Sequence, residues 1–247
     1  MCLKCRAGEA DIPSGTSRRH LLKLAGSAVA GFALAPPSLA RDTKPPPKPQ
    51  NDIPPAGALE RLMKGNARYV EGVTRRHDFT HEREALVGGQ NPYAGILSCA
   101  DSRIAPEYAF DSGRGDLFVC RVAGNFANDD TVASLEYAVS VLKTPLLLVL
   151  GHEGCGAVSA TIKSLKDNTT LPGHLPSLVR ALEPAVKASM DAPGDKLQNA
   201  IRRNVVDVVA KLKSAAPILS AAVEQGKLNI VGGIYRLGDG KVELIEG

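Results

Sequence analysis

A continuous apolar run at 145–150, PLLLVL, constrains the fold more than any other feature of this sequence. A strand without alternation of apolar and polar residues is buried on both faces, as in a parallel sheet covered by helices. Apolar runs at 94–98, 117–122 and 228–237 predict further strands. The segment 241–245 follows a Gly-Asp-Gly turn, so we expect it to run antiparallel to the strand before it.

Helical patterns fill the intervals between these strands. From Ile201, apolar residues recur at i, i+4, i+7, i+8 and i+11, which predicts an amphipathic helix. Asp129 or Asp130 is expected to cap a helix over 131–142. Other helices are predicted at 58–71, 155–165, 176–190 and from about Pro217 to Gln225. This order indicates an α/β fold, with a mostly parallel central sheet flanked by helices and an antiparallel C-terminal edge strand.

The first 40 residues have the pattern of a bacterial export signal. Basic residues in SRRHLLK at 17–23 precede an apolar, small-residue stretch at 24–35, and Ser38 and Ala40 suit a cleavage site. The paired arginines resemble a twin-arginine signal. A basic N-terminus on a buried helix and an uncleaved anchor are the alternatives, but the apolar stretch is short and rich in glycine. We expect a periplasmic or otherwise exported protein with no stable membrane insertion after signal cleavage.

A proline-rich linker is expected at 41–56 and one folded domain at 57–247. Most of the net charge of +4 falls in the signal, so the domain is nearly neutral and gives no reason to expect a nucleic-acid partner. Removal of the signal leaves Cys99, Cys120 and Cys155, an odd number that does not fit a disulfide framework. Because Cys120 lies inside a predicted strand, we expect it in the core.

Two predicted strands end in residues that bind metals. Cys99 and Asp101 follow the strand at 94–98, and His152 and Cys155 follow the PLLLVL strand. Carboxyl ends of parallel strands form the ligand-binding edge of a sheet. Two thiolates and an imidazole suit zinc. Each of these residues alone has an ordinary structural explanation, but their positions at two strand ends favour a metal site.

These motifs resemble those of β-class carbonic anhydrases. The matching segments are CADSR at 99–103, GDLF at 115–118, RVAGN at 121–125, SLEYAV at 134–139, GHEGCGA at 151–157, RNV at 203–205 and VGGIY at 231–235. The resemblance covers about 57–247. The two ligand motifs and their spacing are specific, whereas the glycines and apolar runs alone would be weak evidence.

The resemblance implies one Zn2+ per subunit, held by Cys99, His152 and Cys155 with a fourth position open. It implies reversible hydration of carbon dioxide to bicarbonate and a proton, through attack by zinc-bound hydroxide. Asp101 and Arg103 match the catalytic pair of the family. Asp101 either accepts a hydrogen bond from the hydroxide or becomes a fourth ligand, and a bidentate bond from Arg103 would hold it off the metal.

Other positions follow from the same resemblance. Gln90 and Gly156 are expected to bind substrate, and the chain is expected to form a homodimer or a tetramer, with a contact through the helix at 58–71. Some family members have a noncatalytic bicarbonate site with a tryptophan where this chain has Ile96, so bicarbonate inhibition of that type is not expected. Histidines outside the motif are expected to have no metal role, although one could carry protons; they are His77, His81 and His174.

Three alternatives remain open from the sequence. A hydrolase of carbonyl sulfide or carbon disulfide would use the same zinc residues. A noncatalytic zinc or redox-sensing protein would result if Asp101 closed the site permanently. A thiol-dependent enzyme would need both cysteines free of metal.

Overall fold

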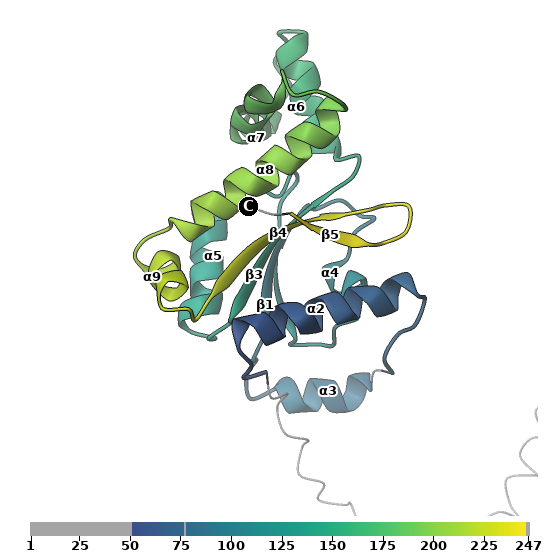
Figure 1. Ribbon diagram of the computed structural model, residues 1–247, viewed down its shortest axis with the longest axis vertical. Helices are drawn as coiled ribbons and strands as arrows, with labels where there is room; N and C mark the ends of the chain where they lie inside the picture. The colour runs from purple at the N-terminus through teal and green to yellow at the C-terminus, as the bar shows by residue number, and fades with distance from the viewer. Residues whose placement is uncertain (1–50, 77, 246–247) are drawn as a thin grey trace, which may run out of the picture. The chain divides into compact units, whose positions relative to one another are not determined.

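The computed structural model describes residues 51–76 and 78–245, with the side chains of Phe79 and His81 left undescribed. The expected signal at 1–40 and most of the expected linker at 41–56 lie outside the described residues. Within 51–76 and 78–245, no helix has the length and apolar character needed to cross a membrane. The elements along this part of the chain (Figure 1) are α2 (Pro55–Val70), α3 (Phe79–Leu86), β1 (Ala94–Ser98), α4 (Pro106–Ala109), β2 (Leu117–Arg121), α5 (Asp129–Ser140), β3 (Leu146–His152), α6 (Gly156–Lys166), α7 (Leu175–Ser189), α8 (Lys196–Lys213), α9 (Ile218–Glu224), β4 (Asn229–Tyr235) and β5 (Val242–Ile245).

Five strands form one sheet in the order β2-β1-β3-β4-β5. β1 pairs in parallel with β2 and β3, and β3 pairs in parallel with β4. β5 is antiparallel to β4 at the edge of the sheet. β3 lies in the middle and all seven of its residues are buried, as its continuous apolar run predicts. The expected α/β fold, with its antiparallel C-terminal edge strand, is confirmed.

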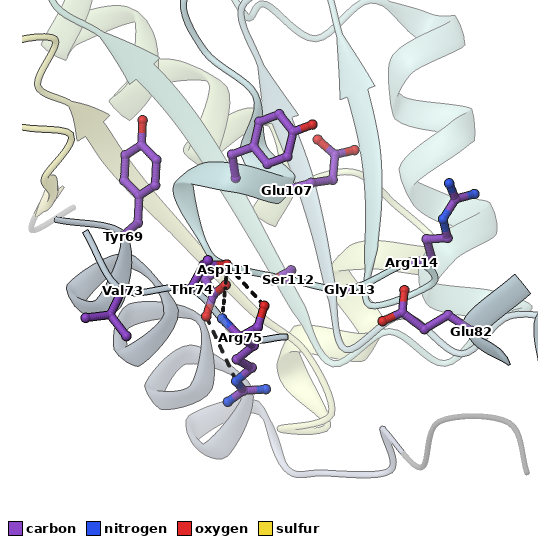
Figure 2. Close-up of a pocket in the computed structure, with 11 residues that line it drawn as sticks. Tyr69, Val73, Thr74, Arg75, Glu82, Glu107, Asp111, Ser112, Gly113 and Arg114 are labelled. Carbon is purple, nitrogen blue, oxygen red and sulfur yellow. Dashed lines mark hydrogen bonds and ion pairs between the residues drawn. The ribbon is translucent and has the colours of Figure 1, made fainter. Parts of the chain in front are cut away.

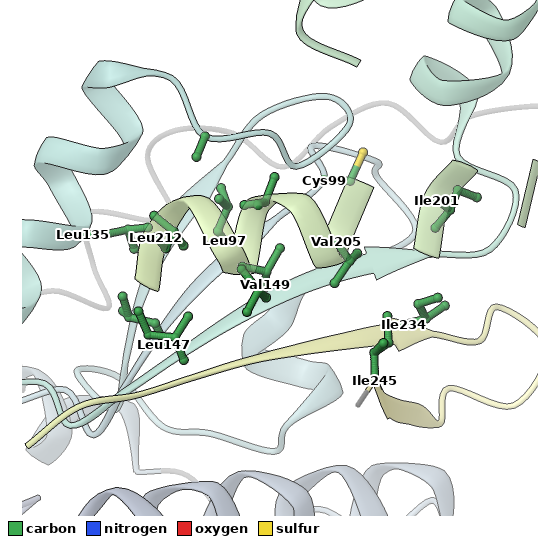
Figure 3. Close-up of a cluster of buried hydrophobic side chains, with 14 of the residues drawn as sticks. Leu97, Cys99, Leu135, Leu147, Val149, Ile201, Val205, Leu212, Ile234 and Ile245 are labelled. Carbon is green, nitrogen blue, oxygen red and sulfur yellow. The ribbon is translucent and has the colours of Figure 1, made fainter. Parts of the chain in front are cut away.

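The two faces of the sheet carry separate apolar clusters, because successive strand residues point to opposite sides. Leu97, Leu147 and Val149 pack with helices α5 to α9 (Figure 3). Ile96 and Leu148 point to the other face and pack with α2 and α4. The sheet is therefore a central layer between helices (Figure 1).

Glycines in two strands let α8 lie close against the sheet. A Cβ atom added at Gly151 of β3 or at Gly232 of β4 would lie 2.7 Å from a methyl group of Val205 on α8. A side chain at either position would push the helix away. The close approach places α8, including the neighbouring Asn204, beside the carboxyl end of β3.

One predicted helix cap is wrong. α5 begins directly after Asn128, whose Oδ1 accepts a hydrogen bond from the Thr131 amide at 3.0 Å. The expected caps, Asp129 and Asp130, instead lie in the first turn of the helix. There their negative charges still complement the positive end of the helix dipole.

Other helix positions also differ from the sequence-based expectations. Pro55 and Ala56 belong to the first turn of α2 rather than to the linker, since a proline at the first helical position is compatible with helix geometry. α3 and α4 were not predicted. They span eight and four residues, and helices this short show little apolar periodicity.

Candidate metal centre

Cys99, His152 and Cys155, called the ligand triad below, meet at the carboxyl edge of the sheet. Cys99 directly follows β1, His152 is the last residue of β3, and Cys155 is the N-cap residue of α6. Their ligand atoms all lie within 4.8 Å of one another. The parallel pairing of β1 with β3 brings the first two together across 53 residues of sequence. All three residues are buried.

The spacing and chemistry of the triad fit a zinc ion. The sulfur atoms of Cys99 and Cys155 lie 4.0 Å apart. Two sulfurs bound to one tetrahedral zinc at roughly 2.3 Å each would lie about 3.8 Å apart. Little movement of these two side chains would be needed to accept the ion.

The imidazole of His152 has its Nε2 atom free to bind a metal. Its Nδ1 atom lies 2.8 Å from the carbonyl oxygen of Glu153. A carbonyl oxygen can only accept, so Nδ1 carries the proton and Nε2 has a free lone pair. Nε2 is buried and has no hydrogen-bond partner in the part of the chain that the structure describes. An unpaired buried nitrogen of this kind is costly unless a ligand completes it.

Without a metal, the thiols of Cys99 and Cys155 have very different pKa values. A hydrogen bond from Cys155 lowers the pKa of Cys99 to about 4, in spite of burial, and His152 and the Gly124 amide act in the same direction. The pKa of Cys155 is raised well above its usual range by its hydrogen bond to the Cys99 sulfur and by burial. One thiolate is thus present at neutral pH before any ion arrives. Thiolates are the form in which cysteine binds metals.

Backbone and helix contacts fix the sulfur of Cys99. The Gly124 amide donates to this sulfur at 3.3 Å, and Nδ2 of Asn204 donates to the Gly124 carbonyl oxygen at 2.9 Å. Gly124 has φ +87°, where side chains are strained, and an added Cβ would also lie 2.8 Å from Leu182. Asn204 on α8 therefore supports the sulfur of Cys99, a candidate metal ligand, indirectly through Gly124.

Asp101 and Arg103 form the bidentate pair that the sequence predicts. The Nε and Nη2 atoms of Arg103 donate to the two carboxylate oxygens at 2.9 and 2.7 Å, and the Arg103 amide donates to Oδ1 at 3.0 Å. The hydrogen bond from Arg103 holds the pKa of the Asp101 carboxyl well below its usual range. Asp101 is not among the residues whose ligand atoms form the triad. The carboxylate lies beside the triad and remains ionised.

Of the two residues predicted to bind substrate, Gly156 lies next to the triad and Gln90 does not. Gly156 is the first residue of α6, next to Cys155, and a Cβ there would meet open space. Gln90 is exposed and precedes β1, at the end of the strand opposite to the triad, so one chain does not bring it to this site. Ile96 is fully buried under α2.

The remaining cysteine and histidines do not join the triad. Cys120, expected in the core, is half-buried on β2, where burial raises the pKa of its thiol. His174 is exposed at the start of α7. His77 and the side chain of His81 lie outside what the structure describes.

Four supporting residues were missed by the sequence analysis. All four lie in segments that resemble the family, and the sequence predicts no role for any of them; they are Arg121, Gly124, Glu153 and Asn204. Glu153 lies between the two ligands of the second motif, and its carboxylate accepts from the Leu237 amide at 3.0 Å. Arg121 binds the backbone around Asp101, as described below. Nothing in the spacing of these residues reveals their contacts, because each partner is distant in sequence.

Two cavities, of about 770 and 810 Å³, lie away from the triad. The smaller one lies between the end of α2 and α4 (Figure 2). On its wall, Asp111 accepts hydrogen bonds from the Thr74 hydroxyl at 2.8 Å and the Arg75 amide at 3.0 Å (Figure 2). Neither cavity is lined by a triad residue or by Asp101. The large cavities therefore do not mark the position of the candidate metal site.

The fold and the triad together define an α/β protein with a candidate metal site, and comparison with known proteins identifies its family. A family model described as carbonic anhydrase matches residues 94–242. Carbonic anhydrase from Mycolicibacterium smegmatis is 38% identical over 191 residues, covering 77% of this chain and 93% of the relative. Carbonic anhydrase 2 from Mycobacterium tuberculosis is also 38% identical, covering 77% and 92%.

Solved structures agree with these relatives. The β-carbonic anhydrase CcaA superposes with a TM-score of 0.62 at 29% identity, covering 77% of this chain and 89% of the other. A tetrameric β-carbonic anhydrase from Sordaria macrospora has a TM-score of 0.59 at 23% identity, covering 78% and 95%, and shows the likeness of fold. The chain belongs to the carbonic anhydrase family, in its β class, and is an enzyme.

Proposed function

We propose that the protein catalyses the reversible hydration of carbon dioxide to bicarbonate and a proton, with one zinc ion bound by Cys99, His152 and Cys155. The observation that carries this proposal is the buried Nε2 of His152, which lacks a partner among the described residues while its triad neighbours supply two sulfurs. Relatives named carbonic anhydrase support the choice of reaction.

When bound at the triad, zinc supplies a Lewis acid that makes water a nucleophile near neutral pH. Cys99, His152 and Cys155 would hold the ion, and three protein ligands would leave room for this water. Asp101 accepts a hydrogen bond from the attacking water and so orients its lone pair toward the carbon of the substrate. Arg103 keeps the carboxylate ionised and turned toward the guanidinium, so that Asp101 would not itself bind the ion.

Substrate contacts are assigned to two further residues. Gly156 leaves space beside the start of α6 for a small molecule to approach the backbone. Gln90 donates a hydrogen bond to a substrate oxygen. Because Gln90 lies at the opposite end of β1 from the triad, this role requires a Gln90 from another copy. The proposal therefore includes a homodimer or a tetramer, in line with a relative described as tetrameric.

Export of the protein by its signal is also part of the proposal. The paired arginines and the apolar stretch that follows them support it. Fractionation of the source bacterium, with mass spectrometry of the mature N-terminus, tests this point. Recovery of the uncleaved chain in the cytoplasm alone would refute it.

Stopped-flow measurement of carbon dioxide hydration tests the reaction. The purified protein is assayed after its zinc content has been measured, after chelation, and after zinc is restored. We expect fast hydration that chelation abolishes and zinc recovers. Zinc-loaded protein without hydration activity would refute the proposal, and hydrolysis of carbonyl sulfide by the same preparation would then identify the alternative substrate.

A further inference from the structure

The guanidinium of Arg121 binds three backbone carbonyl groups of one short segment. Arg121 is the last residue of β2, and its Nε atom donates to the Cys99 carbonyl oxygen at 3.0 Å. Its Nη2 atom donates to the carbonyl oxygens of Asp101 at 2.8 Å and Ile104 at 2.7 Å. These contacts span residues 99–104, called the 99–104 segment below.

The 99–104 segment carries the groups on which the proposed chemistry depends. It begins with a triad ligand, contains the Asp101–Arg103 pair, and ends at Ile104, which is buried in the apolar cluster under α2. A hydrogen bond from the Ile104 amide to the Asp101 carbonyl oxygen, at 3.1 Å, closes a turn within it. The position of the Asp101 carboxylate therefore depends on the conformation of this turn.

Three carbonyl oxygens that converge on one point repel one another, and a cationic donor between them offsets this repulsion. Arg121 supplies this cation in a planar fork with several N–H donors, and hydrogen bonds from a charged donor are stronger than those from a neutral one. Within the described part of the chain, no carboxylate pairs with Arg121. Its charge is thus directed at the 99–104 segment.

We propose that Arg121 is a positioning residue, which fixes the 99–104 segment so that Asp101 stays beside the triad. This role rests on the proposed carbon dioxide hydration. Arg121 reaches Asp101 through its main chain, whereas Arg103 binds its side chain. The two arginines therefore hold the same residue from two sides, one fixing where its backbone lies and the other where its carboxylate points.

Three variants of the full-length, zinc-loaded protein test this role: Arg121→Gln, Arg121→Lys and the control Arg180→Gln. Arg180 is exposed on α7, distant in sequence from the segment. Lysine keeps the charge but lacks the planar fork, so it cannot reproduce all three bonds. The readouts are zinc content, thermal midpoint, kcat and KM, and hydrogen exchange of the amides of residues 103 and 104.

We expect both Arg121 variants to retain zinc and to lose kcat by about 10- to 100-fold with little change in KM, the range seen for small misplacements of catalytic groups. Exchange at residues 103 and 104 should accelerate by at least about 10-fold, while the amides of β1 and β3 stay protected. The control should match the wild type in every readout.

Other results would overturn the inference. If Arg121→Gln had the kcat and the amide hydrogen exchange of the wild type, the 99–104 segment would hold its position without Arg121. Full activity in Arg121→Lys would show that charge alone suffices. Accelerated exchange throughout the sheet would indicate a general structural role. An inactive zinc-loaded wild type would instead refute the proposed function, and the exchange measurements would still test whether Arg121 orders the segment.

Discussion

The Oδ2 atom of Asp101 lies 3.9 Å from the Nε2 atom of His152, although Asp101 follows β1 and His152 is the last residue of β3. This distance is too long for a hydrogen bond. The carboxylate therefore neighbours the nitrogen that would bind a metal without pairing with it. Arg103 donates to both carboxylate oxygens, and Nε2 carries no proton to donate to them while Nδ1 donates to the Glu153 carbonyl oxygen.

Replacement of Asp101 tests the role of its charge. Asp101→Asn preserves the size of the side chain but removes the ionised acceptor, so we expect normal zinc content and a loss of kcat/KM of about 100-fold or more. Stopped-flow hydration and metal analysis provide the measurement. Asp129→Asn, in the exposed first turn of α5, is the control. Normal turnover in Asp101→Asn would remove the carboxylate from the mechanism.

Loss of one triad sulfur should empty the metal site. We expect Cys155→Ser to fold but to lose most of its zinc, and hydration to fall to the background rate, because a neutral hydroxyl is a far poorer zinc ligand than a thiolate. Cys120→Ser, a half-buried cysteine outside the triad, should keep both zinc and activity. Full zinc content in Cys155→Ser would show that the ion binds elsewhere.

The stability of the metal-free protein should depend on pH through Cys99. Its pKa falls to about 4 on folding, below the ordinary thiol value of about 8.5 that the unfolded chain retains. The folded state is therefore favoured as the thiolate, and this stabilisation is lost as the pH falls from about 8.5 toward 4. The raised pKa of Cys155 has the opposite sign, and its contribution is lost only at alkaline pH.

Urea unfolding of the metal-free protein between pH 5 and pH 8 measures this effect. The free energy of unfolding should rise with pH in the wild type and rise less steeply in Cys99→Ser. Cys120→Ser should keep the wild-type slope, since burial raises the pKa of Cys120 and leaves it neutral in this range. Equal slopes in Cys99→Ser and the wild type would contradict the low pKa of Cys99.

Asn204 should influence zinc affinity without touching the ion. Asn204→Ala removes the hydrogen bond to the Gly124 carbonyl, and thereby loosens the amide that donates to the Cys99 sulfur. We expect zinc affinity to weaken by about 10- to 100-fold in competition with a chelator. Asn199→Ala is a matched control on the same helix, where the amide donates to the Pro193 carbonyl at 3.0 Å. Unchanged affinity in Asn204→Ala would show that the sulfur needs no such support.

Much of the fold could be read from residue patterns. The run at 145–150 predicted the buried central strand, and the sites at its end followed from where parallel strands present their carboxyl ends. The triad was predictable because two of its members share one short motif and the third follows a neighbouring strand. The N-cap residue of α5 could not be predicted in this way. Asn128 and the two aspartates after it are all favourable N-cap residues, and only the backbone geometry decides among them.

The supporting contacts could not be predicted in the same way. Arg121 and Asn204 act on carbonyl groups, and a backbone carbonyl carries no signature in the sequence. Their effect depends on distances between β2, α8 and the segment after β1, which the three-dimensional fold alone determines. The export signal and the oligomeric state remain predictions.

The parallel pairing of β1 with β3 has a consequence for how the protein acquires its metal. Cys99 and His152 become neighbours only after β1 and β3 have paired, although helices α4 and α5 and the edge strand β2 separate them in the sequence. Of the three triad residues, an unfolded chain therefore offers the ion at most the local pair of His152 and Cys155. An ion that prefers the folded state stabilises it by mass action, by about 4 kcal/mol at a concentration 1,000 times its Kd. The supply of zinc would therefore affect the lifetime of the folded state. When zinc is scarce, the protein would be inactive and also more susceptible to proteolysis.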